Sequence, residues 1–169
     1  NNATLTSTGS LLGGLTNQAG GTVNARGAIN GQVTNSGTFN VTGNLTGNTG
    51  FENAGAGVLA VSGGDYTGLT AITNNSTAVN GINVSANRTL GAQIITNAAG
   101  ASILNTGDLN ASNRIDNSGT LTSTGRITGL FNNNAGATAF LQTSLSGAVN
   151  NSGTITLTGN LGGVTAMTQ

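Results

Sequence analysis

The sequence predicts an all-β protein, a β-solenoid of about nine coils that forms one domain over residues 1–169. A short motif of an apolar residue, usually Thr, and then an amide returns at intervals of 16 to 23 residues from one end of the chain to the other. Gly (29), Thr (28) and Asn (26) supply 83 of the 169 residues, a mixture that favours strands and turns over helices. The interval is too short for helix-pair repeats and fits one turn of a solenoid, whose coils bury their apolar sides by stacking.

The motif places one amide in each repeat. Examples are Leu15-Thr16-Asn17 and Ile95-Thr96-Asn97, and a variant is Phe131-Asn132-Asn133. We expect these residues to stack at one corner of the solenoid, because Asn tolerates turn geometry and stacked amides hydrogen-bond along their column. The predicted amide column consists of Asn1, Asn17, Asn35, Asn53, Asn74, Asn97, Asn117, Asn133, Asn151 and Gln169.

Four apolar columns align with the amides and predict the core. The fourth column is the apolar residue of the motif itself, and the second lies two residues after the first, running from Ser7 to Leu157. A spacing of two places both side chains on one face of a strand. The first column is Leu5, Val23, Phe39, Leu59, Ile82, Ile103, Leu121, Ala139 and Ile155, and the third is Leu11, Ile29, Leu45, Tyr66, Leu90, Leu109, Ile127, Leu145 and Leu161.

Each coil is predicted to contain three short strands joined by tight bends, with Gly at many corners. The distance from the amide to the first apolar column varies between coils, but it is always even: 4, 6, 4, 6, 8, 6, 4, 6 and 4 residues. Paired insertions preserve the alternation of side chains, so the core columns remain aligned. Nine coils at the interstrand spacing give a rod about 43 Å long.

Charge is sparse and balanced, with four Arg and four acidic residues. A chain without a basic patch is a poor partner for nucleic acid or an anionic membrane, so we expect neither. Six of the eight charges fall between residues 52 and 116, where the three longest coils also begin. A specific interaction surface is therefore predicted at Glu52, Asp65, Arg88, Asp108, Arg114 and Asp116.

The sequence contains no constellation that indicates catalysis. Cys, His and Lys are absent, so no thiolate metal site or Cys nucleophile exists. Glu52 and Asp116 share a column position but are three coils apart, about 14 Å at the interstrand spacing, which is too far for a retaining carboxylate pair. Arg114 and Asp116 are interpreted as a surface ion pair. We expect a non-enzymatic protein without catalytic residues, cofactor or metal.

Other features bear on alternative functions. No apolar run approaches the roughly 20 residues that span a bilayer, so we expect no membrane insertion by this segment. Thr pairs such as Thr120 and Thr122 resemble an ice-binding face, although the array is interrupted. Ice binding and polysaccharide-active chemistry remain lower-ranked alternatives. The chain begins inside a repeat, so a targeting sequence is expected to lie elsewhere.

Three segments support a family resemblance: Asn35-Ser36-Gly37-Thr38-Phe39, Asn117-Ser118-Gly119-Thr120-Leu121 and Asn151-Ser152-Gly153-Thr154-Ile155. With these motifs the chain resembles the β-helical passengers of bacterial autotransporters and filamentous-haemagglutinin-like adhesins. The resemblance implies a right-handed parallel β-helix, secretion to the bacterial cell surface, and a role in adhesion, aggregation or building the matrix of a biofilm.

The leading hypothesis is thus a structural, non-catalytic rod segment of a secreted surface adhesin or extracellular fibre. Its partner would be a host surface or a neighbouring cell. The alternative is a filament subunit that stacks end to end on further copies of itself, because joining Met167-Thr168-Gln169 to Asn1-Asn2-Ala3-Thr4-Leu5 nearly restores the repeat.

Overall fold

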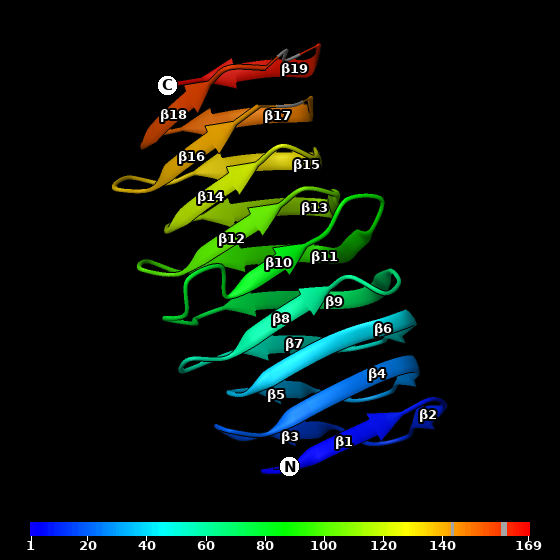
Figure 1. The fold of residues 1–169 in the computed structure, drawn as a ribbon. Helices are drawn as coiled ribbons and strands as arrows, with labels where there is room; N and C mark the ends of the chain where they lie inside the picture. Colours follow the sequence, from blue (N-terminus) through cyan, green and yellow to red (C-terminus); the bar gives the residue numbers. More distant parts are fainter. Residues whose placement is uncertain (143, 160–161) are drawn as a thin grey trace.

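A computed structural model describes residues 1–142, 144–159 and 162–169. These residues form one sheet of 19 strands in which every pairing is parallel, and no helix occurs among them. Figure 1 shows the coils stacked in sequence order from the N-terminal end to the C-terminal end. The predicted all-β solenoid of about nine turns is confirmed.

The first coil contains three strands and each later coil contains two. In chain order the strands are β1 (Thr4–Ser7), β2 (Ser10–Leu11), β3 (Leu15–Asn17), β4 (Thr22–Ile29), β5 (Val33–Asn35), β6 (Thr38–Gly47), β7 (Gly50–Asn53), β8 (Val58–Val61), β9 (Tyr66–Asn74), β10 (Ile82–Val84), β11 (Thr89–Asn97), β12 (Ser102–Asn105), β13 (Asp108–Asn117), β14 (Thr120–Ser123), β15 (Arg126–Asn133), β16 (Thr138–Leu141), β17 (Leu145–Asn151), β18 (Thr154–Leu157) and β19 (Gly163–Thr168).

The prediction of three strands per coil was wrong after the first coil. In β4 and β6 the first two predicted strands are continuous, and from β9 onward the last two are continuous. At the predicted bend the strand continues through a shift in register, for example between Ala92 and Ile94 where β11 pairs with β13. A bulge bends a strand while pairing continues on both sides of it, so a corner does not require an end to the strand.

The first, second and fourth apolar columns are confirmed by the pairing. Leu59 pairs with Ile82 in the first column, Val41 with Val61 in the second, and Ile72 with Ile95 in the fourth. The apolar central members are buried and form one continuous hydrophobic core, and the polar members Asn105 and Ser123 of the second column are buried and hydrogen-bonded to each other. Even spacing from the amide thus preserves the alignment of the columns through corners of different length.

The predicted alignment of the third column was wrong at one step. Leu11 pairs with Ile29 as predicted, but Ile29 then pairs with Gly47, two residues beyond Leu45. Leu45 pairs with Tyr66, and the column continues correctly to Leu145. A slip of two residues keeps both Ile29 and Leu45 facing inward, so parity alone could not detect it. Leu161, the last predicted member, lies outside the described residues.

An aromatic cluster fills the core of the third and fourth coils. The rings of Phe39 and Phe51 meet edge to face at 5.2 Å between centroids, and Phe39 stacks on Tyr66 at 6.2 Å. Gly47 lies beside this cluster, and a β-carbon there would collide with the side chain of Leu69. Large side chains on one coil are therefore accommodated by small residues on the next.

Candidate functional surface

The amide column forms a hydrogen-bonded ladder along the solenoid. Each Asn from Asn1 to Asn133 donates from Nδ2 to the Oδ1 atom of the corresponding Asn in the next coil, at distances of 2.8 to 3.2 Å. All eight bonds point in the same direction. The side chains from Asn17 to Asn133 are almost completely buried, so this is an internal ladder.

The same amide groups also close the corners. Nδ2 of Asn97 donates to the carbonyl oxygens of Ala101 at 3.3 Å and Thr120 at 3.1 Å, besides Oδ1 of Asn117 at 2.8 Å. Two N–H groups thus serve three acceptors, one of them through a shared bond. The backbone N–H of Thr120 in the next coil also donates to the carbonyl of Ala101, so the Asn side chain adds a second donor at this corner.

The ladder ends at Asn151 within the described residues. Oδ1 of Asn151 accepts hydrogen bonds from Nδ2 of Asn133 and from the backbone N–H of Gly153. Gln169, the last predicted member, follows the paired residue Thr168 but is exposed. Among the described residues, its side-chain amide forms no hydrogen bond with that of Asn151. The longer Gln side chain does not reproduce the Asn geometry there.

The residues of the predicted interaction surface fall into two separate groups. Asp65, Arg88 and Asp108 lie at or just before the starts of β9, β11 and β13, where Arg126 joins them from β15. Glu52, Arg114 and Asp116 lie near the ends of β7 and β13, beside the amide ladder. Asp108 and Asp116 stand at opposite ends of β13, so the structure does not bring the six residues together.

Charges in the first group are bonded to nearby protein groups. Arg126 forms an ion pair with Asp108 at 3.0 Å, and this hydrogen bond, together with the attraction of the carboxylate, raises the pKa of Arg126. Oδ1 of Asp65 accepts the backbone N–H of Thr89 at 2.9 Å, and Nε of Arg88 donates to the carbonyl of Ser62 at 3.1 Å. These contacts link consecutive coils.

The second group forms a polar column on the outer face. The predicted ion pair is confirmed, with Nε of Arg114 2.7 Å from Oδ2 of Asp116. Asn132 donates to Asp116 at 2.7 Å, and Asn150 donates to Asn132 at 2.9 Å. Glu52 is three coils away, through Thr73 and Thr96, as the alignment predicted. Its carboxylate accepts a hydrogen bond from Nδ2 of Asn75 at 3.4 Å.

All four acidic side chains within residues 1–142, 144–159 and 162–169 are hydrogen-bonded to neighbouring protein groups. Asp108 and Asp116 each contact an Arg, and the described residues contain no group of three or more His, Cys, Asp or Glu side chains. The buried phenol of Tyr66 is the one strongly perturbed titratable group in this part of the chain, and burial raises its pKa. It lies in the core, away from solvent.

The outward Thr positions form aligned but chemically mixed columns. Thr120 pairs with Thr138, and Thr138 pairs with Thr154. The adjacent column reads Thr122, Phe140 and Thr156, and Phe140 is 43% exposed. An aromatic ring interrupts the Thr pairs, so the regular array that an ice-binding surface would use is broken.

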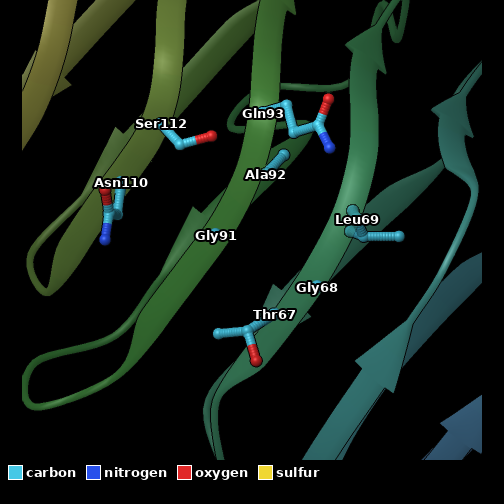
Figure 2. A pocket seen from close by; sticks show the side chains of 8 residues that line it. All are labelled: Thr67, Gly68, Leu69, Gly91, Ala92, Gln93, Asn110 and Ser112. Carbon is cyan, nitrogen blue, oxygen red and sulfur yellow. The ribbon is translucent and has the colours of Figure 1, made fainter.

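An open groove of about 280 Å³ crosses the outer side of β9, β11 and β13, and sequence reasoning did not identify it. Figure 2 shows the side chains that line it. Its polar residues are Thr67, Gln93, Asn110 and Ser112, and its other lining residues are Gly68, Leu69, Gly91 and Ala92. The groove occupies the same three long coils in which the sequence predicted a specific surface. A signal was present in Gly68 and Gly91, which remove side chains from the strand face.

Comparisons of the chain with family models, curated proteins and solved structures found no match. Among the described residues there is no helix with the length and apolar character needed to cross a membrane.

Proposed function

We propose that this chain is a structural, non-catalytic rod segment of a secreted bacterial surface adhesin or extracellular fibre. The observation that best supports the proposal is the unbroken asparagine ladder, which connects every coil from Asn1 to Asn151 inside a continuous hydrophobic core. Interactions that repeat in each coil favour an extended, regular scaffold. Most charged side chains link neighbouring coils and so strengthen the same scaffold.

Location and adhesion can be tested together. Antibodies raised against the purified chain should label intact cells of the source bacterium as strongly as permeabilised cells. The chain displayed on a non-adherent bacterium should increase attachment to host cells or aggregation between bacteria. The core variant Leu45→Asp, displayed in equal amount, is the control for a folded rod. Labelling confined to permeabilised cells, or equal attachment with and without the displayed chain, would reject the proposal.

End-to-end assembly is a second candidate, favoured by the surface of the last described coil. Ile155, Leu157 and Met167 line a hollow of about 200 Å³ there, together with Asn151 and Gln169. Leu157 is 39% and Met167 48% exposed, although both occupy core columns. A further coil would cover these side chains, whether it came from the same chain or from a second copy.

Sedimentation velocity over a range of concentrations distinguishes these two sources. Stacking between copies predicts a sedimentation coefficient that rises with concentration, and Met167→Lys should abolish the rise. The matched control is Thr165→Lys, an exposed position on the same strand. Monomers of the unmodified chain at every concentration would count against a filament and leave the rod segment in place.

A further inference from the structure

We propose that the groove over β9, β11 and β13 binds a neutral saccharide, because it places four hydrogen-bonding side chains without partners around a small apolar floor in an uncharged hollow. This inference is independent of the proposed rod function, since the coils would stack equally well with the groove empty.

The groove follows from two consecutive irregularities in the pairing. Register shifts occur between Leu90 and Ala92 where β11 meets β9, and between Ala92 and Ile94 where β11 meets β13. Gly68 adopts a left-handed φ of 82°, which few residues other than Gly accept. Gly91 pairs with Asn110 and lies against the methyl group of Thr67, so it leaves a gap between two side chains on the outer face.

The polar side chains of the groove differ from the polar column of Asp116, Asn132 and Asn150 in having no protein partner among the described residues. Asp116, Asn132 and Asn150 bond to one another from coil to coil. By contrast, Thr67, Gln93, Asn110 and Ser112 form no side-chain hydrogen bond with any residue that the structure describes. Figure 2 shows Asn110 and Ser112 on β13 at one side of the hollow, Thr67 on β9 at the other side, and Gln93 on β11 between them. Hydroxyl and amide groups can each match a sugar hydroxyl as donor or acceptor.

Nearby charges do not favour an ionic ligand. Asp65, just before β9, precedes Thr67 by two residues, and Asp108, the first residue of β13, precedes Asn110 by two. Asp65 accepts a backbone N–H, and Asp108 is paired with Arg126. The lining itself contains no charged residue. A phosphate or carboxylate would therefore lose hydration without meeting a cation in the groove.

Size and the apolar floor indicate a sugar rather than a larger partner. The lining residues come from three neighbouring strands, which span about 10 Å at the interstrand spacing. Leu69 and Ala92, which are 3% and 7% exposed, lie at the base of the groove beneath the polar side chains. Pyranose rings present C–H groups on one face and hydroxyls around the edge, so a mono- or disaccharide matches both parts of the groove.

The test is a titration of the ¹⁵N-labelled chain followed by backbone amide NMR shifts, with maltose, cellobiose and lactose as the probes. We expect saturable shifts at residues 67–69, 91–93 and 110–112 with at least one of these sugars, at millimolar concentration. Glucose 6-phosphate and glucuronate are the charged comparisons. Absence of saturable shifts with all three neutral sugars, or tighter binding of the charged sugars, overturns the proposal.

Matched variants separate groove binding from general contact with the surface. Asn110→Ala should weaken binding at least tenfold, whereas Thr128→Ala, its partner on β15 outside the groove, should leave binding unchanged. Both positions face outward, and circular dichroism verifies that both variants are folded. Equal affinity of Asn110→Ala and Thr128→Ala would place the sugar elsewhere and reject this site.

Discussion

At the scale of single residues, the asparagines from Asn17 to Asn133 in the amide ladder have the strictest chemical requirement in the chain. Each supplies a donor to the next coil, an acceptor to the previous coil, and further donors to corner carbonyls. Asp has the right length but lacks the N–H groups, and Leu has the right volume but no polar atoms. The Asn side chain therefore combines properties that no similar residue shares.

Replacing one central Asn should destabilise the fold strongly. Asn97→Leu leaves Oδ1 of Asn117 and the carbonyls of Ala101 and Thr120 without this donor, and should lower the free energy of unfolding by about 3 kcal/mol or more. Asn97→Asp should cost more, because a buried carboxylate would face three oxygen acceptors. Denaturant unfolding measures both. The control is the exposed Asn113→Asp, and equal stability of Asn97→Leu and the control would contradict the ladder's role.

Tyr66 predicts a loss of stability at alkaline pH. Its pKa is raised by burial, so folding favours the neutral phenol. Stability from this preference is complete below the unfolded pKa of about 10 and is lost as pH rises from there toward the folded value. Tyr66 is the single Tyr and the chain has no Lys, so no other side chain titrates between about pH 8 and about pH 11. The melting temperature of the unmodified chain should be lower at about pH 11 than at about pH 8, and this difference should be much smaller for Tyr66→Phe.

At the scale of strands and corners, the sequence predicts which residues face inward because side chains alternate between the two faces of a strand. The first, second and fourth columns were predictable because alternation distinguishes inward from outward positions. The slip at Ile29 and Leu45 was not, because two registers separated by two residues bury the same face. The groove was missed for a similar reason: it arises from bulges, which alternation does not encode.

Neighbouring residues on β6 test the inward and outward assignments. Leu45 is buried and Thr46 is exposed on the same strand. Leu45→Asp should prevent cooperative folding or cost more than about 4 kcal/mol, whereas Thr46→Asp should change stability by about 0.5 kcal/mol. Thermal melts followed by circular dichroism provide the comparison. Identical melts for the two variants would show that the assignment of faces is wrong.

Corner glycines differ in the space available to a side chain. A β-carbon at Gly125 would overlap the carbonyl oxygen of Gly107, whereas Gly9 has no atom within 4 Å of that position. Gly125→Ala should therefore lower the melting temperature by several degrees, and Gly9→Ala should leave it nearly unchanged. If both variants melt together, close approach of consecutive coils is not what requires Gly at position 125.

At the scale of the whole molecule, stability should vary along the rod. Each coil contacts only the coils next to it, so a central coil is covered on two sides and an end coil on one. Leu5, Leu11 and Ile155 are partly buried near the two ends of the described chain, while Ile82 and Leu90 are completely buried.

Amide hydrogen exchange should reveal this gradient. Protection should be highest in β10 to β13 and fall toward β1 and β19. Measurements on the unmodified chain, by mass spectrometry or NMR, provide the profile. Uniform protection in all coils would indicate a single cooperative unit rather than stacked repeats.

Orientation of the hydrogen bonds has a mechanical consequence. Parallel pairing connects consecutive coils, so a pull along the rod axis loads those bonds along their length and can detach one coil at a time. A coil occupies about 4.8 Å of rod, but its 16 to 23 residues extend to roughly 55 to 80 Å once released. Under tension the molecule would therefore lengthen in large discrete steps while its covalent chain stays intact.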